Sequence, residues 1–318
     1  MLVDFIGNND VLNELEKNLE NQDISHAYLF LGNEGVGKFT AAKALAKRIL
    51  CDDSDSSYCS IMDTFEHPDL TIIRSENSIK KAQIEELISD SFKKPFAGKY
   101  KVFIIDGFED VTISGQNSLL KTLEEPEKYL KIILLSNNVR KILPTILSRV
   151  RIIKFNNVQE EDIVEFLQTK ENVGIDNARL FARLSGGSVK KALLYSKDPK
   201  YLTLRDESIS VLDRLINKTA SSPFKEYSFF NDNREMLDEI FNVFLSFLRD
   251  VAVLDLDLEE ENLVNIDRMT LLKKQNLSAI KATEMSEHII KAIELLEKNT
   301  NFQLTIEQLL INIGGVKW

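Results

Sequence analysis

The sequence predicts an α/β domain followed by an all-helical region. In the first half of the chain, short β-rich runs alternate with helical patterns, which is typical of a parallel sheet with right-handed crossover connections. After Phe155 no further strand pattern is evident, and one helical pattern succeeds another. A chain of 318 residues is also too long for one small module, so we expect two or three domains.

Five runs in the first half have the composition of β-strands. The runs VFII and IILL lack polar alternation, as expected of parallel strands that are buried on both faces. The predicted strands lie at residues 27–31, 70–73, 102–105, 132–135 and 150–155. Helical patterns separate them at residues 38–50, 79–91 and 114–123. Together these elements predict one sheet domain.

The second half carries helical patterns alone. The predicted helices lie at residues 160–168, 176–184, 189–195, 237–251, 286–296 and 304–311. The pattern at 237–251 repeats apolar residues at three- and four-residue spacing, which marks a long amphipathic helix. Polar segments around Pro199 and around Pro223 are interpreted as connections.

Composition indicates a folded, cytoplasmic protein without a membrane partner. Hydrophobic residues make up 43% and charged residues 28%, an ordinary globular balance. No apolar stretch approaches the roughly 18 residues of a membrane span, and the N-terminal residues do not resemble a signal peptide. Two cysteines cannot build a disulfide framework, which suits a reducing compartment. A net charge of −10 means that bulk charge does not drive nucleic-acid binding.

The strongest local signal is the run GNEGVGKFT at residues 32–40, which follows a predicted strand and opens a predicted helix. Gly32, Gly37 and Lys38 have the spacing of a phosphate-binding loop, with Gly35 between them. Backbone N–H groups of such a loop surround phosphate oxygens, and the helix N-terminus adds favourable partial charge. Lys38 would supply a point charge to the terminal phosphates. The loop predicts ATP or ADP binding, and the alternative is a glycine-rich turn that no longer binds.

The hydroxyl that normally binds Mg²⁺ in such a loop is missing. A Ser or Thr usually follows the lysine and ligates the metal, whereas this chain has Phe39. Thr40 lies one residue further on, about 100° round the helix, and is an uncertain substitute. We therefore expect Mg²⁺ to be held weakly or not at all.

A second nucleotide motif is expected where the apolar strand KVFIID ends in Asp106. A carboxylate at this place usually holds the metal through water, and the less favoured alternative is that Asp106 is a turn residue that ends the strand. The glutamate that commonly follows and orients the attacking water is replaced by Gly107. Glu109 and Asp110 are expected past the strand end, in a turn. The chain keeps parts that hold phosphate and lacks parts that would cleave it.

Two further runs resemble a known family. Residues 115–126, GQNSLLKTLEEP, resemble the NALLKTLEEPP signature of bacterial clamp-loader subunits of the AAA+ class. Residues 141–150, KILPTILSRV, resemble the LLPTILSRC segment of the same family, with Val150 in place of the cysteine. HAYLF at 26–30, HPDL at 67–70 and an NTN…L…EQLL pattern at 299–310 also match. The resemblance runs nearly the whole length, and the first two runs together are highly specific.

The resemblance implies a fold and a set of partners. It implies a RecA-like AAA+ nucleotide-binding core at 1–156, a small helical lid at 157–203 and a helical oligomerisation collar at 204–318. It also implies a subunit of the DNA polymerase III clamp loader, which places a sliding clamp on primed DNA. The implied partners are tau/gamma-type ATPase subunits and a delta-type subunit, with the clamp and the DNA backbone met through the complex.

The resemblance also assigns roles by position. Arg149 would act as an arginine finger, reaching the ATP site of an adjacent ATPase subunit and neutralising charge on the γ-phosphate. Asn137 falls where the family's first nucleotide-sensing residue lies, and Lys190 falls where related ATPases carry a sensing arginine. The alternatives are that Arg149 caps a helix or pairs with a local carboxylate, and that Asn137 and Lys190 merely cap or are solvated.

The family usually inserts a four-cysteine zinc module before the HPD segment. Cys59 fits the last ligand position, but Ser56 and Asp53 occupy the two positions before it, and Cys51 is left as a first ligand. Because structural zinc usually needs four Cys or His ligands, we expect no zinc.

The tau/gamma-type subunits of the family keep a full GKT loop and a DE pair. Phe39 and Gly107 therefore fit a different subunit, one that holds its neighbours in place without turning over ATP itself. Two other functions are alternatives. An autonomous P-loop ATPase or kinase is motivated by the loop alone, and a purely structural AAA+ scaffold would carry Lys38 as a relic.

Overall fold

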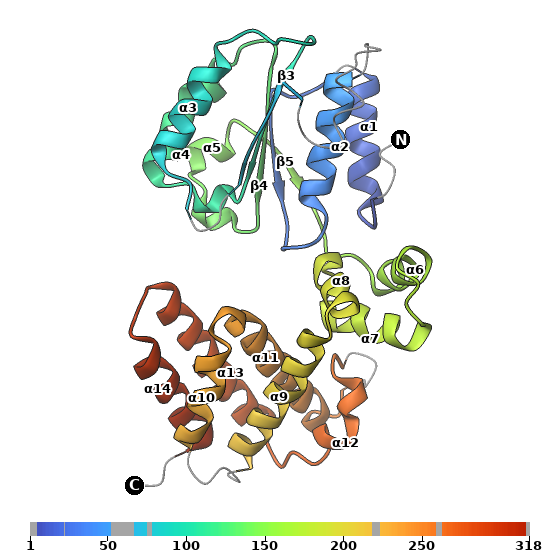
Figure 1. The fold of residues 1–318 in the computed structure, drawn as a ribbon, viewed down its shortest axis with the longest axis vertical. Helices are drawn as coiled ribbons and strands as arrows, with labels where there is room; N and C mark the ends of the chain where they lie inside the picture. Colours follow the sequence, from blue (N-terminus) through green and yellow to red (C-terminus); the bar gives the residue numbers. More distant parts are fainter. Residues whose placement is uncertain are drawn as a thin grey trace. The chain divides into compact units, whose positions relative to one another are not determined.

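The computed structural model describes residues 5–21, 23–51, 67–74, 78–217, 223–258 and 263–315. Its contacts divide the chain into two compact units, Met1–Leu193 and Leu194–Trp318. In their described residues, the first unit holds a sheet covered by helices and the second holds helices alone (Figure 1). The predicted order of an α/β region followed by helices is confirmed. The boundary between the units falls inside residues 157–203, which were predicted as a separate lid. The part of this segment before residue 194 groups with the sheet.

One parallel sheet runs in the order β2–β3–β4–β1–β5. Its strands are β1 (Ala27–Leu31), β2 (Leu70–Arg74), β3 (Lys101–Asp106), β4 (Leu130–Ser136) and β5 (Arg151–Lys154). Each overlaps a predicted strand. Every residue of the central strand β4 is buried, which explains why its run IILL lacks polar alternation. Because parallel strands end at the same edge of a sheet, the segments that follow β1, β3 and β4 lie close together.

Helices cover both faces of the sheet. They are α1 (Asn9–Glu20), α2 (Lys38–Cys51), α3 (Lys81–Ser91), α4 (Ile113–Glu124) and α5 (Pro144–Leu147). Figure 1 shows α1 and α2 on one side and α3, α4 and α5 on the other. Tyr28 and Phe30 of β1 pack into the first apolar layer, and Ala27 and Leu29 pack into the second. The period-two alternation of side chains along a strand thus builds both layers.

Three short helices follow the sheet: α6 (Glu160–Lys170), α7 (Ile175–Ser185) and α8 (Val189–Lys197). The turn between α7 and α8 is made by Gly186 and Gly187, whose φ angles of +58° and +87° lie in the left-handed region. A Cβ atom on Gly187 would lie 2.6 Å from the Cβ of Asn157, so only glycine fits this approach. The turn brings the start of α8 back towards the sheet.

The second unit packs its helices around one apolar core. They are α9 (Pro199–Ile216), α10 (Tyr227–Asp232), α11 (Leu237–Asp255), α12 (Met269–Leu272), α13 (Ala279–Glu297) and α14 (Phe302–Gly314). The segment around Pro199 does connect two helices, but the connection is Asp198 alone, and helix α9 was not predicted. Pro199 is the first residue of α9, where its missing N–H is not needed, and Asp198 caps the helix by accepting a 2.9 Å hydrogen bond from the Lys200 N–H. Helix α13 also begins earlier than predicted, at a Ser278 cap.

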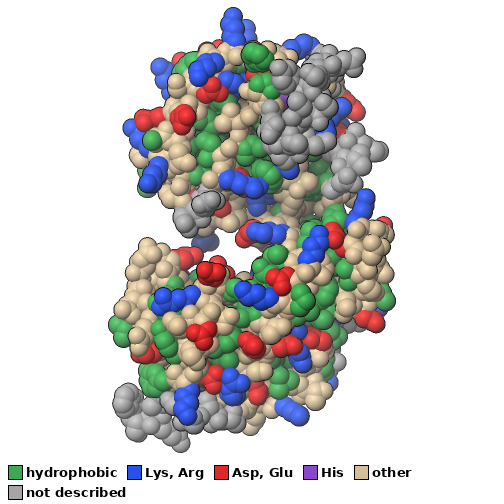
Figure 2. Space-filling view, viewed as in Figure 1, with side chains coloured by type: hydrophobic (Ala, Val, Ile, Leu, Met, Phe, Trp, Pro, Cys, Tyr) green, Lys and Arg blue, Asp and Glu red, His purple; other side chains and the backbone are tan. Residues whose placement is uncertain are grey.

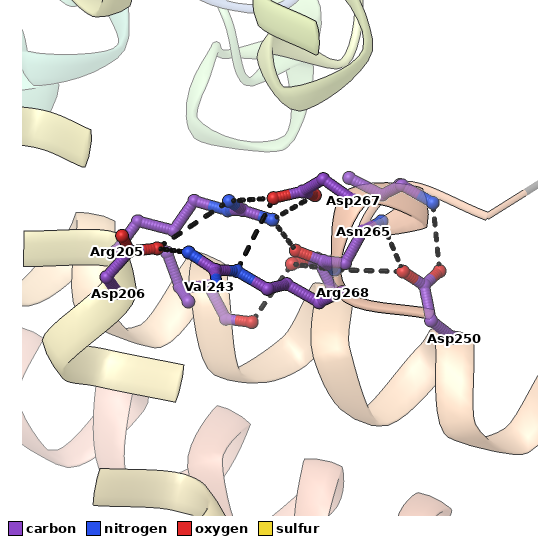
Figure 3. Close-up of polar contacts among 9 residues, drawn as sticks. Arg205, Asp206, Val243, Asp250, Asn265, Asp267 and Arg268 are labelled. Carbon is purple, nitrogen blue, oxygen red and sulfur yellow. Dashed lines mark hydrogen bonds and ion pairs between the residues drawn. The ribbon is translucent and has the colours of Figure 1, made fainter. Parts of the chain in front are cut away.

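A buried polar network ties the segment 263–268 to α9 and α11 (Figure 3). Arg205, only 2% exposed, donates 2.9 and 2.7 Å bonds to the two carboxylate oxygens of Asp267 and a 2.8 Å bond to Asn265 Oδ1. Asp250, fully buried on α11, accepts from the backbone and side-chain amides of Asn265 at 2.6 and 2.8 Å. Asn265 therefore links the buried guanidinium to the buried carboxylate.

The exposed surface mixes charges of both signs. On the face drawn in Figure 2, basic and acidic side chains are interspersed over both units. This distribution agrees with the inference that net charge does not drive nucleic-acid binding. Within the described part of the chain, no helix has the length and apolar character needed to cross a bilayer.

Candidate functional site

The predicted phosphate-binding loop connects β1 to α2 in the structure. Gly35 and Gly37 have φ angles of +79° and +95°, which side chains other than glycine rarely adopt. A Cβ atom on Gly35 would lie 2.0 Å from Ser188 Oγ, and one on Gly37 would lie 2.6 Å from the ring of Phe5. The glycines are therefore needed both for the backbone turn and for the close approach of neighbouring segments.

The ammonium of Lys38 folds back over the loop. Its Nζ donates hydrogen bonds to the backbone carbonyls of Gly32 at 2.6 Å and Asn33 at 2.7 Å. Burial lowers the pKa of Lys38, and the nearby carboxylates of Glu109 and Asp106 oppose that shift. An incoming phosphate would have to replace the carbonyls as the partner of this ammonium.

The start of α8 contacts the loop directly. Lys190 Nζ lies 2.6 Å from Glu34 Oε1, and the Lys190 N–H donates to the Gly35 carbonyl at 3.4 Å. The hydrogen bond from Lys190 lowers the pKa of Glu34, so this carboxylate is ionised at neutral pH. The structure thus brings Lys190 to the loop, as its proposed sensing role requires, but it pairs Lys190 with a carboxylate of the loop itself.

Asp106 and Phe39 are joined by a residue that the sequence did not single out. Arg74, the last residue of β2, donates from Nε to Asp106 Oδ2 at 3.0 Å. Its guanidinium carbon lies 4.0 Å from the centroid of the Phe39 ring. Thr40, the proposed substitute for the missing hydroxyl, is solvent-exposed.

Asn137 and Glu109 meet beyond the ends of β4 and β3. The backbone N–H of Asn137 donates to Glu109 Oε1 at 3.3 Å. Glu109 lies in a 3-10 turn after Gly107, as expected, and the left-handed conformation of Gly107 (φ +80°) begins that turn. The other oxygen of Glu109 is buried without a hydrogen-bond partner in the described residues. The charge of this carboxylate acts on Lys38, an interaction that the sequence could not reveal.

Arg149 follows α5 and is partly exposed. Its Nη1 donates to the Thr145 carbonyl at 2.8 Å and lies 3.0 Å from Ser148 Oγ, while Nη2 lies 2.5 Å from Glu124 Oε1. The side chain keeps 32% of its surface accessible to solvent. In this conformation Arg149 therefore does pair with a carboxylate of its own chain, Glu124, as one of the alternatives holds. Its guanidinium is nevertheless not buried within its own subunit.

A pocket of about 480 Å³ lies between residues 5–9 and helix α6. Phe5 lines this pocket and also packs against Gly37 of the loop. Phe166 and Lys170 of α6 line it as well. Its volume lies in the range of small-ligand sites, and its position beside the loop was not apparent from the sequence.

Of the cysteine segment, only Cys51 lies within the described residues. Cys51 ends α2 and is not a free thiol, whereas Cys59, Ser56 and Asp53 fall outside the described residues. The described residues contain no His, Cys, Asp and Glu grouping that could hold a metal. The absence of zinc stays a prediction.

The HPD segment is structural. Asp69, 1% exposed, accepts hydrogen bonds from the backbone N–H groups of Phe96 at 2.6 Å and Ala97 at 2.7 Å. His67 is buried, and its Nδ1 accepts from the Asp69 N–H at 3.1 Å. Burial lowers the pKa of His67, which favours the neutral ring in this arrangement. These residues hold the loop between α3 and β3.

Two family models match the chain. One, described as DNA polymerase III, delta subunit, matches residues 7–159, and one described as its C-terminal part matches residues 199–314. The DNA polymerase III subunit delta' of Bacillus subtilis is 28% identical over 313 residues, which cover 95% of this chain and 94% of that protein. The tau/gamma subunit of Haemophilus influenzae is 29% identical over 231 residues, 69% of this chain and 32% of that protein.

A solved structure shares the fold. The crystal structure of a DNA polymerase III gamma-subunit-related protein from Thermotoga maritima superposes with a TM-score of 0.52 at 19% identity, covering 94% of this chain and 98% of that one. The parallel sheet, the loop after β1 and the helical C-terminal region are thus a fold that this chain shares with that protein. The chain belongs to the family of DNA polymerase III clamp-loader subunits.

Proposed function

We propose that this chain is a delta-prime-like subunit of the DNA polymerase III clamp loader. In this role it supplies Arg149 as an arginine finger to a neighbouring tau/gamma-type ATPase subunit during ATP-dependent loading of the sliding clamp onto primed DNA. The observation that carries the proposal is that Arg149, within LPTILSR, is one-third exposed and held by surface contacts. The similarity to a delta' subunit over nearly the whole of both chains supports the choice of subunit.

The home nucleotide site is proposed to have little or no ATPase activity. Phe39 replaces the metal-binding hydroxyl, and Gly107 offers no side chain to orient a water molecule. Glu109, one of the two carboxylates in the turn after β3, uses one oxygen to accept the N–H of Asn137. ATP or ADP would be held by the loop and Lys38, with the base in the pocket beside Phe5.

Complex formation tests the proposed assignment. When the full chain is mixed with tau/gamma-type and delta-type subunits of its own organism, we expect one complex in size-exclusion chromatography with light scattering. The complex should load the clamp onto primed DNA, and omission of this chain should abolish loading. Separate elution of this chain, or full loading without it, would contradict the proposal. ATP hydrolysis by the isolated chain that is abolished by Lys38→Ala would favour the autonomous ATPase instead.

Replacing Glu34 by glutamine is expected to tighten nucleotide binding several-fold. The ionised carboxylate of Glu34 lies in the loop that would receive phosphate, and it pairs with Lys190. It would therefore compete with phosphate for the Lys190 ammonium and would also repel the phosphate directly. The measurement is titration of the full chain with fluorescent mant-ADP. Glu127→Gln, which removes the same charge from an exposed position, is the matched control. Equal affinities for the wild-type chain and Glu34→Gln would contradict this expectation.

A further inference from the structure

The place where a P-loop protein holds its metal is filled by side chains in this molecule. In P-loop NTPases the metal is bound by the hydroxyl that follows the loop lysine and by an aspartate on a neighbouring strand. The residues at these two places are Phe39 and Asp106. Phe39 has no oxygen to offer, and Asp106 Oδ2 accepts a 3.0 Å hydrogen bond from Arg74 Nε. This set of residues does not fit Mg²⁺, which prefers near-octahedral oxygen coordination.

The register of the sheet explains why Arg74 reaches this place. Arg74 and Asp106 are paired residues on the neighbouring parallel strands β2 and β3, and both are the last residues of their strands. Paired side chains point to the same face of a sheet, so the two meet at the edge where the phosphate loop lies. Phe39 lies on that face as well, because it packs against the apolar layer that contains Tyr28 and Phe30.

Two separate contacts orient the guanidinium. Its guanidinium carbon lies over the Phe39 ring, 4.0 Å from the ring centroid, a distance typical of a cation–π contact. Its edge donates to Asp106. The side chain nevertheless remains 58% exposed, so part of the guanidinium faces solvent. A guanidinium held in this way presents N–H donors in a geometry that matches phosphate oxygens.

The positive charge of Arg74 also stands where a metal cation would otherwise supply it. The Asp106 carboxylate acts electrostatically on Lys38, so Arg74 and Lys38 flank the same acidic group. Arginine stays protonated at any physiological pH, so it supplies a permanent positive charge. A divalent cation entering here would meet that charge and would find its carboxylate ligand already engaged.

We propose that the guanidinium of Arg74 takes the place of the metal ion, so that this site receives the phosphate chain of a nucleoside di- or triphosphate as the free anion. Mg²⁺ then adds nothing to the affinity and lowers it to the extent that it sequesters the nucleotide in solution. The proposal rests on phosphate binding by the loop, and it does not depend on the role of Arg149.

Titration of the full chain with mant-ADP in Mg²⁺ and in EDTA tests the proposal. The wild-type chain is expected to bind equally well or better in EDTA. Arg74→Ala is expected to weaken binding in EDTA by about tenfold, because it removes a charge-assisted hydrogen bond to phosphate. Arg179→Ala, which removes an exposed arginine from α7, should leave the affinity unchanged. Circular dichroism checks that both variants are folded.

The double variant Phe39→Thr with Arg74→Ala provides the converse test. It restores a hydroxyl after Lys38 and releases Asp106, so Mg²⁺ is expected to tighten mant-ADP binding to this variant alone. Tenfold tighter binding of mant-ADP to the wild-type chain in Mg²⁺, or no effect of Arg74→Ala in EDTA, would overturn the proposal. No binding of mant-ADP by the wild-type chain in either condition would overturn it together with phosphate binding, while the Arg149 role is measured separately in the complex.

Discussion

In a reconstituted clamp loader, replacing Arg149 by alanine is expected to lower ATP turnover at the neighbouring site by about 10³-fold or more. The planar guanidinium of an arginine finger makes paired hydrogen bonds to phosphate oxygens and offsets charge that develops in the transition state. The assembled complex should survive, because Arg149 packs at the surface end of α5 and outside the core of the helical unit. Arg149→Lys keeps the positive charge but lacks the paired N–H donors of the guanidinium, so we expect it to restore little of the turnover.

The resting contacts of Arg149 are weak enough to be exchanged. The ion pair with Glu124 is partly exposed on both sides, at 32% and 48% of the side-chain surface. Ion pairs of this kind contribute about 0–1 kcal/mol. A 10³-fold rate effect corresponds to about 4 kcal/mol, so the interaction in the neighbouring site would outweigh the local one.

The variant Glu124→Gln separates the finger from a purely local role. If Arg149 acts in the neighbouring site, loss of its local partner should leave turnover unchanged or raise it. If Arg149 serves only to pair with Glu124, both variants should give the same small effect. The measurement is ATP hydrolysis by the purified complex, with light scattering to confirm assembly. Wild-type turnover in an assembled Arg149→Ala complex would rule out the finger.

The strands and the phosphate loop could be predicted because their signals are local. The runs VFII and IILL lie in β3 and β4, and the spacing of Gly32, Gly37 and Lys38 lies within seven consecutive residues. Helix α9 was missed for a local reason too. Pro199 was interpreted as a connection, although proline is well tolerated at the first position of a helix.

The contacts that decide the chemistry of the site are long-range and could not be predicted. Arg74 meets Asp106 across 32 residues, and Lys190 meets Glu34 across 156. The first pairing depends on the register of two parallel strands, and the second depends on where α8 begins relative to the loop. Neither register nor docking follows from the composition of a single segment, since both are set by packing of the whole unit.

Replacing Arg205 by alanine is expected to lower the free energy of unfolding of the helical unit by about 3–5 kcal/mol. The guanidinium is 2% exposed and satisfies Asp267 and Asn265 together. Its loss leaves the Asn265 side-chain carbonyl without that donor in a fully buried position and removes the buried one of the two guanidinium groups that pair with Asp267. Because Asn265 also donates to Asp250, the effect should spread to the contact between segment 263–268 and α11.

Arg268 provides a matched control within the same network. It contacts Asp267 and Asp206, but its side chain is 40% exposed, so Arg268→Ala should cost only about 0–1 kcal/mol. Urea unfolding followed by circular dichroism measures both variants, with the transition of the helical unit as the readout. Equal stabilities of the two variants would show that burial does not give Arg205 its importance. If the helical unit forms the contacts between subunits, Arg205→Ala should fail to enter the complex at temperatures where Arg149→Ala still assembles. This difference would distinguish Arg205, which stabilises its own subunit, from Arg149, which acts on the neighbouring subunit.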